Sequence, residues 1–254
     1  LEMALRNARD ELHNLAAGRT AEGALLARLQ KRLGLGRLPR RIECFDNSTL
    51  MGAEPVAGMI VFIDAQRSPA AYRTFVLHTA GIPDDYAAMA EVLRRRFAPR
   101  TPADPLPDLV LLDGGRGQLG VAAAALKDLG LTGVFDLIAI AKKDERRGET
   151  RDKIFVPGRV NPVGFGREED LRLFLQRVRD EAHRFVVDFH RRRRHTAGLR
   201  SVLDGIRGLG PARKRQLLRH FGSIEAIRTA TLAELSMLPG IRPSIAAEIK
   251  RQLG

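Results

Sequence analysis

Two short apolar runs that each end in an aspartate constrain the fold of this chain most strongly. Residues 41–46 read RIECFD and residues 108–113 read DLVLLD, and such runs are typical of buried strands. If the two strands are neighbours in one sheet, the carboxylates of Asp46 and Asp113 lie a few ångströms apart at its edge. Oxygen ligands of this kind suit Mg²⁺ or Mn²⁺, although an aspartate after a strand can also simply begin a turn.

The segment from residue 40 to residue 141 predicts one mixed sheet with flanking helices. Strands are predicted at 42–46, 55–64, 71–78, 108–113 and 135–141, and helices at 83–97 and 118–129. Short connections make the first three strands an antiparallel meander, while the continuously apolar fourth strand suits a parallel position buried on both faces. This order is that of a ribonuclease H-like α/β fold, in which the first and fourth strands are central neighbours, although the analogy is at the level of the fold alone.

An amphipathic helix is predicted over residues 168–190, after a charged loop at 144–167 that is rich in Gly and Pro. His183 lies on the polar face of this helix, which would cover the edge of the sheet that holds the aspartates. The pattern favours a ligand role and a purely structural role for His183 about equally. The loop is either a flap that contacts substrate or a mobile segment.

The last part of the chain contains an internal repeat at an offset of 32 residues, and each copy reads as helix, tight glycine turn, helix. Glycines let the backbone approach a phosphate, and the helix that follows offers free N–H groups. Two such helix–hairpin–helix units can grip both strands of a duplex across the minor groove. Candidate DNA contacts in this module are Gly208, Gly210, Arg213, Lys214, Arg215, Gly240 and Arg242. In the second copy Arg242 stands where the first has Gly210, so charge replaces close backbone approach there.

Charge and composition point to a polyanionic partner. The net charge is +13, and residues 191–254 hold 14 Lys and Arg against 4 Asp and Glu. Nucleic acid is the first expectation and an anionic membrane surface the second. The chain has no Trp and only two Tyr, so we do not expect it to bind single-stranded DNA by stacking bases on aromatic side chains. No apolar run is long enough to span a membrane, and the single cysteine, Cys44, excludes internal disulfides, so we expect a cytoplasmic protein.

Four regions follow from these patterns. Residues 1–39 are predicted to form two helices that act as a linker or partner-binding arm, or as an edge of the next domain. The sheet domain covers residues 40–190 and a basic tether covers 191–198. Residues 199–254 form a small all-α domain with the tandem hairpins.

Several motifs resemble the C-terminal half of the UvrC subunit of the bacterial nucleotide excision repair nuclease. These motifs are the stretches at 42–46, 84–87, 112–119 and 179–185, followed by the terminal tandem hairpins. The resemblance implies a ribonuclease H-like endonuclease that cuts 5′ to a lesion in damaged duplex DNA. It also implies UvrB as a partner, with UvrA in the same pathway. The sequence departs from the family after the first aspartate, where Asn47-Ser48-Thr49 replaces the frequent Ile-Ser-His.

The same resemblance assigns the chemistry to a metal-binding triad of Asp46, Asp113 and His183, with a weaker role for Asp85. We expect Asp46 and Asp113 to bind Mg²⁺ or Mn²⁺, which activates a water for in-line attack, while His183 completes the coordination or handles a proton. One metal ion is at least as compatible with these ligands as two. Lys142, at the end of the fifth strand, is a candidate phosphate contact.

Two other functions stay open at this stage. A junction-resolving nuclease on the same fold is usually a dimer, whereas we expect a monomer. A non-catalytic scaffold that binds duplex or junction DNA would bind with a steep salt dependence and without metal-dependent cleavage. The pair of strand-end aspartates argues against the scaffold, because binding alone does not need it.

Overall fold

The computed structural model describes residues 18, 20–48, 55–77, 85–98 and 105–253. The chain divides into two compact units, Leu1–Val187 and Asp188–Gly254. None of the described helices is long and apolar enough to cross a membrane. The predicted N-terminal pair of helices is described only in its second part, a helix over residues 20–33.

The N-terminal unit is built on one mixed sheet with strand order β3-β2-β1-β5-β6-β7, and β4 also pairs with β2. Its strands are β1 (Arg41–Ser48), β2 (Val56–Ile63), β3 (Gln66–Arg67), β4 (Arg73–Val76), β5 (Leu109–Asp113), β6 (Asp136–Ala141) and β7 (Lys153–Phe155). β2 is antiparallel to β1, and β5 runs parallel to β1 in the centre of the sheet. The predicted mixed sheet with β1 and β5 as neighbours is therefore confirmed.

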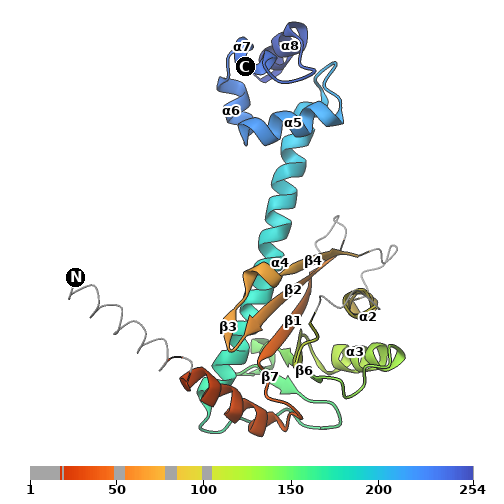
Figure 1. The fold of residues 1–254 in the computed structure, drawn as a ribbon, viewed down its shortest axis with the longest axis vertical. Coiled ribbons are helices and arrows are strands. Elements are labelled where there is room, and N and C mark those ends of the chain that lie inside the picture. Colours follow the sequence, from red (N-terminus) through yellow and green to blue (C-terminus); the bar gives the residue numbers. More distant parts are fainter. Residues whose placement is uncertain (1–17, 19, 49–54, 78–84, 99–104, 254) are drawn as a thin grey trace, which may run out of the picture. The chain divides into compact units, whose positions relative to one another are not determined.

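Helices cover both faces of this sheet (Figure 1). On one face, α2 (Asp85–Phe97) and α3 (Arg116–Asp128) pack on a core that includes Phe45 and Leu112. On the other face, the helix over 20–33 and the long α4 (Glu169–Asp204) pack on Cys44 and Leu111. Neighbouring residues of each central strand thus point to opposite cores, which is why both strands are apolar throughout.

The predicted third strand at 71–78 is wrong in part. The chain forms the two-residue β3, a short 3₁₀ helix η1 (Pro69–Ala71) and then β4, and both strands pair with β2. Pro69 is the reason, because it lacks an N–H for the sheet but fits the first turn of a helix. Residue 78 and the predicted helix start at 83–84 lie outside the described residues, within which α2 begins at Asp85.

The structure also differs from the predicted tether at 191–198. α4 continues as one helix from Glu169 to Asp204, so these residues are helical. The segment from 169 to 197 contains no Gly or Pro, and arginine is a good helix former, so nothing local ends the helix. The apolar stripe predicted for this helix is confirmed, with Leu171, Leu175 and Val178 fully buried.

The C-terminal unit repeats one backbone pattern. The end of α4 and α5 (Pro211–Phe221) flank the first hairpin, and α7 (Leu232–Ser236) and α8 (Pro243–Leu253) flank the second, with α6 (Ile224–Thr229) between them. The turn residues 205–210 and 237–242 have the same local structure, position by position. The apolar residues of both copies share one small core. The predicted internal repeat is therefore confirmed.

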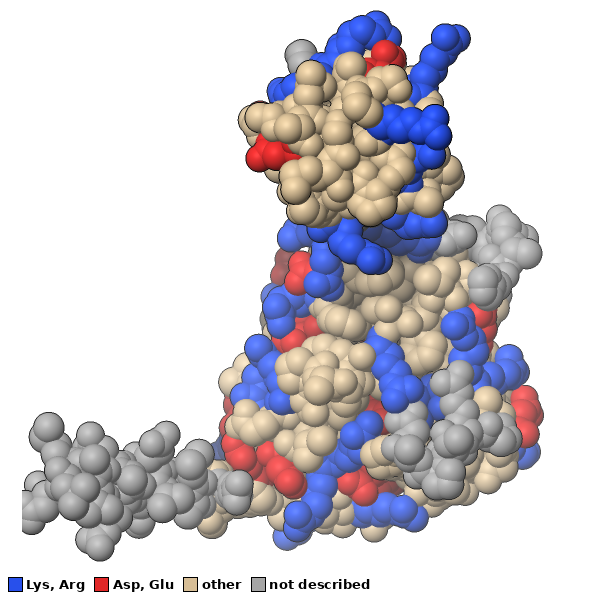
Figure 2. Space-filling view, turned by 45° about the horizontal axis from the view of Figure 1, so that its top comes forward, with Lys and Arg blue, Asp and Glu red and all other residues tan. Residues whose placement is uncertain are grey.

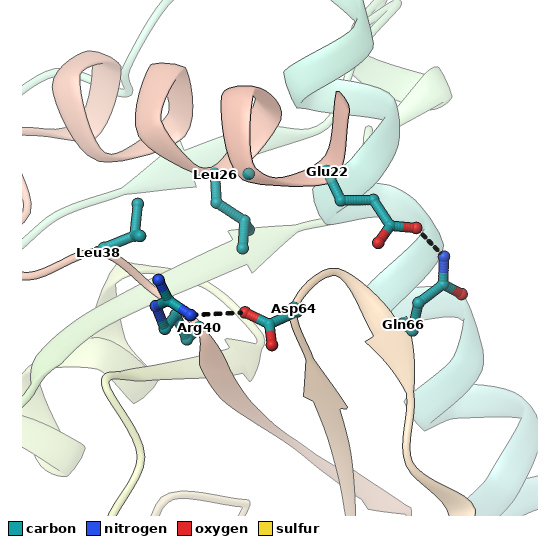
Figure 3. A pocket seen from close by; sticks show the side chains of 7 residues that line it. Glu22, Leu26, Leu38, Arg40, Asp64 and Gln66 are labelled. Carbon is teal, nitrogen blue, oxygen red and sulfur yellow. Dashed lines mark hydrogen bonds and ion pairs between the residues drawn. The ribbon is translucent and has the colours of Figure 1, made fainter. Parts of the chain in front are cut away.

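A groove of about 610 Å³ lies between the helix over 20–33 and the sheet. Figure 3 shows Leu26 pointing into it, with an ion pair between Arg40 and Asp64 (3.6 Å) and a hydrogen bond from Gln66 to Glu22 along its border. These residues flank the beginning of β1 and the end of β2. The groove is therefore at the opposite end of β1 from Asp46, and neither Asp46, Asp113 nor His183 lines it.

Candidate active site

Parallel pairing of β1 and β5 brings the two strand-end aspartates together. Phe45 pairs with Leu112, and Asp46 and Asp113 each come one residue later. Both carboxyl groups lie on the face of the sheet that α4 covers, because they share the side of Cys44 and Leu111. The sequence prediction that the two carboxylates meet is confirmed in its geometry.

α4 adds a histidine to this pair. Nδ1 of His183 lies 3.1 Å from Oδ2 of Asp46, and the histidine side chain is 63% exposed whereas that of Asp46 is 7% exposed. One potential ligand atom from each of Asp46, Asp113 and His183 lies within 4.8 Å of the others. Among the described residues, this is the group of acidic, His and Cys side chains with the spacing of a metal site.

A glycine that the sequence analysis overlooked allows α4 to come this close. Gly58 in β2 pairs directly with Asp46, and a Cβ at this position would lie 2.3 Å from Cγ2 of Val186 and 3.2 Å from the ring of Phe185. Any side chain here would push α4, and with it His183, away from the sheet. An isolated glycine inside a strand is the sequence signal for such a close approach.

Burial and mutual repulsion make the ionised forms of Asp46 and Asp113 unfavourable. Burial, followed by the charge of Asp46, raises the pKa of Asp113 from 3.8 to about 7. Burial also raises the pKa of Asp46, although the charge and hydrogen bond of His183 work against the rise. Two carboxylates that repel each other in a partly buried place favour either a shared proton or a bound cation.

Asp85 and Lys142 are positioned differently from the triad. Asp85 is the exposed first residue of α2 and is not a member of the cluster; its backbone oxygen accepts a hydrogen bond from Nδ2 of Asn47 (3.3 Å). Lys142 is exposed just after β6, whose Ile140 pairs with Asp113. The structure thus places Lys142 at the same edge of the sheet as Asp113.

The two hairpins present their glycines in equivalent ways. Gly208 and Gly240 have φ values of +81° and +80°, which explains why glycine stands at both positions. Gly210 caps α5 and Arg242 is the exposed residue before α8. Pro211 and Pro243 begin these helices, as is common for the first helical residue.

The three basic residues predicted to contact DNA from α5 are not equivalent. Arg213 donates to the backbone oxygen of Gly208 (2.7 Å), and its Nε lies 3.2 Å from where a Cβ of Gly240 would be, so it packs between the hairpins. Lys214 is bonded to Asp204 (2.5 Å) and its side chain is 14% exposed. Arg215 is exposed. Of the three, Arg215 is therefore the most accessible to a phosphate, whereas Lys214 is engaged by Asp204, and the predicted DNA contacts of all three stay predictions.

Comparison with known proteins now adds to this geometry. The model of the UvrC RNase H endonuclease domain matches residues 30–187. The chain belongs to the UvrC family. A second model, the SAM-like helix-hairpin-helix tandem, matches residues 201–254. The resemblance inferred from the motifs is thereby confirmed, and the chain consists of a domain that matches the UvrC RNase H endonuclease model, followed by a helix-hairpin-helix module.

Curated relatives agree over the whole chain. The UvrABC system protein C of Desulfatibacillum aliphaticivorans is 49% identical over 253 residues, and that of Desulforapulum autotrophicum is 44% identical. The chain spans about two fifths of the length of these relatives, 42% and 41%. Among solved structures, endonuclease V of Ciona intestinalis aligns with 52% of this chain and 59% of its own, at 17% identity and a TM-score of 0.32, which is too distant to carry an argument.

Proposed function

We propose that this chain is the part of a nucleotide excision repair nuclease that hydrolyses a phosphodiester bond 5′ to a lesion in damaged duplex DNA. The observation that carries the proposal is the cluster of Asp46, Asp113 and His183, with ligand atoms within 4.8 Å, inside a domain of the UvrC endonuclease family. A scaffold that only binds DNA would have no need for a buried and a partly buried carboxylate beside a histidine.

The residues of the cluster fit a divalent cation, Mg²⁺ or Mn²⁺. Their donors are two carboxylates and one imidazole. Burial, followed by the charge of Asp46, raises the pKa of Asp113, and a bound cation would favour the ionised form of both carboxyl groups. Such an ion, when bound, stabilises charge on the scissile phosphate and lowers the pKa of a water molecule. His183 is largely exposed, so it is the member that can exchange a proton with solvent or substrate.

Further residues position the DNA. Lys142 is a candidate contact to the scissile phosphate, because it is exposed at the edge of the sheet that bears Asp113. We assign Asp85 to the start of α2, where a carboxylate stabilises the helix dipole, and not to metal binding. In the hairpin module, Gly208, Gly210, Gly240, Arg215 and Arg242 offer backbone N–H groups and charge to the phosphates of a duplex.

The surface charge supports duplex DNA as the substrate. In Figure 2, Lys and Arg gather along one edge of the visible face of the C-terminal unit, where few acidic side chains interrupt them. The relatives carry the name of the UvrABC system, so we assign UvrB as the partner and UvrA to the same pathway. A monomeric state and a cytoplasmic location remain predictions.

Incision of a lesion-bearing duplex already nicked on its 3′ side tests the proposal, with UvrA, UvrB and Mg²⁺ present. We expect the chain to cut 5′ to the lesion and the Asp113→Ala variant to bind the duplex without cutting it. A fully active Asp113→Ala variant would refute the assignment of the site. Binding without any cut by the unaltered chain would favour the DNA-binding scaffold instead.

A further inference from the structure

A buried ion pair, Arg179 with Asp152, lies close enough to the candidate metal site for its arginine to act on the charges of Asp46 and Asp113. Arg179 precedes His183 by about one turn of α4, and its side chain is 6% exposed. Its Nη1 is paired with Oδ2 of Asp152, whose side chain is 4% exposed, and its Nη2 bonds Asp180 at 2.5 Å. The Arg179–Asp152 pair joins residues 27 positions apart in the sequence.

The pair connects the two sides of the site. Asp152 uses its other oxygen, Oδ1, to accept a hydrogen bond from the backbone N–H of Lys143 (2.9 Å). Lys143 follows β6 at the edge of the sheet where Ile140 pairs with Asp113. Through Arg179 and Asp152, the turn of α4 before His183 is thus tied to the end of β6, the strand that pairs with β5 beside Asp113.

Stability alone does not account for this arrangement. A buried ion pair loses the hydration of both charges, and well-packed apolar residues of similar size are often at least as stabilising. The charge of Arg179 also acts on the two carboxyl groups of the site. Burial raises the pKa of Asp46 and of Asp113, and the positive charge of Arg179 works against both shifts.

We propose that Arg179, held by Asp152, is a positioning residue of the metal site, which sets the distance of His183 from Asp46 and Asp113. The inference rests on the proposed function, because it presupposes that these three residues bind a divalent ion. Partners of metal ligands that fix their orientation commonly change metal affinity by about 10–100-fold when they are replaced.

The chain offers a matched control for the loss of a buried ion pair. Arg96 in α2 donates to Glu43 in β1 at 2.9 and 2.8 Å, and the two side chains are 3% and 0% exposed. Glu43 faces the opposite side of the sheet from Asp46, since the two are three residues apart in one strand. An Arg96→Met variant therefore breaks a comparable pair away from the metal site.

The test is Mn²⁺ binding, measured by isothermal titration calorimetry, for the unaltered chain and the Arg179→Met, Arg179→Lys, Asp152→Asn and Arg96→Met variants. Circular dichroism without metal reports whether each variant is folded and how stable it is. We expect Arg179→Met to weaken Mn²⁺ binding by about tenfold or more and Arg179→Lys to recover part of the loss. We expect Arg96→Met to lower the melting temperature without changing Mn²⁺ affinity.

The inference is overturned if Arg179→Met is folded and binds Mn²⁺ as tightly as the unaltered chain. If Arg179→Met does not fold, the decision passes to Asp152→Asn and Arg179→Lys, which keep a similar volume, and unchanged affinity in both overturns it. If Arg96→Met weakens Mn²⁺ binding as much as Arg179→Met does, the inference is also overturned, because the effect of Arg179 would then be one of general stability. Absence of Mn²⁺ binding by the unaltered chain would overturn the metal site itself, so the two failures are distinguishable.

Discussion

Replacing Asp113 with Asn should stabilise the metal-free protein at neutral and alkaline pH. In the folded chain, burial and the charge of Asp46 raise the pKa of Asp113 from 3.8 to about 7. Because the folded-state pKa is the higher one, the contribution of this group to stability is fully present below about pH 3.8 and is lost as the pH rises through about 7. Asparagine stays neutral throughout and avoids this loss.

The size of the effect follows from the shift. A difference of about three pKa units corresponds to about 4 kcal/mol of unfolding free energy. Asp113 is only partly buried, so water screens its charge and we expect about half of that, about 2 kcal/mol, at about pH 8. At about pH 4.5 most Asp113 carboxyls are protonated in the folded state, and the two proteins should differ little.

Urea unfolding in EDTA, followed by circular dichroism at both pH values, measures this difference. Asp128→Asn is a suitable control, because the Asp128 side chain is 68% exposed at the end of α3 and its replacement should change stability little at either pH. Addition of Mn²⁺ should stabilise the unaltered chain and leave Asp113→Asn unchanged. An Asp113→Asn variant less stable than the unaltered chain at about pH 8 in EDTA would refute the reasoning.

Two further predictions concern packing and DNA contact. Gly58→Ala should destabilise the N-terminal unit by about 1–3 kcal/mol and greatly reduce Mn²⁺ affinity, because the added methyl displaces α4. Gly120→Ala, in open space on α3, should stabilise it by about 0.5–1 kcal/mol, and equal urea midpoints for the two variants would contradict this account. Arg215→Ala should reduce the slope of log K against log salt concentration for duplex binding by about one, the value expected for one lost phosphate contact. Lys214→Ala should change this slope little, because Lys214 is already paired with Asp204. Fluorescence anisotropy against salt concentration decides, and equal losses from both variants would argue against the assignment.

The sheet and its two aspartates were predictable because their signals are local. Each apolar run fixes a strand, and the aspartate at its end fixes the place of the carboxylate. Parallel pairing then aligns Asp46 with Asp113 one residue after Phe45 and Leu112. The continuation of α4 past residue 190 could also have been predicted, since residues 169–197 contain no Gly or Pro. The run of arginines at 191–194 suggested a linker instead.

Other features depend on contacts between distant segments. The position of His183 requires α4 to approach β2 over Gly58. The glycine signals that some segment comes close, but only the packed structure shows that this segment is α4. The Arg179–Asp152 pair joins a helix to a loop. In the hairpin module, the exposure of Arg215 and the pairing of Lys214 with Asp204 depend on how the end of α4 lies against α5. A charge count along the sequence treats these two residues alike.

The most direct test of the central claim is equilibrium binding of Mn²⁺ to the chain and to its Asp46→Asn variant. Asp46 is the most buried member of the cluster and contacts His183 at 3.1 Å, so its loss removes a ligand with little change in shape. The account predicts that the unaltered chain binds Mn²⁺ and that the variant binds it at least about 100-fold more weakly. Equal affinity in the two proteins would contradict a metal site at Asp46, Asp113 and His183.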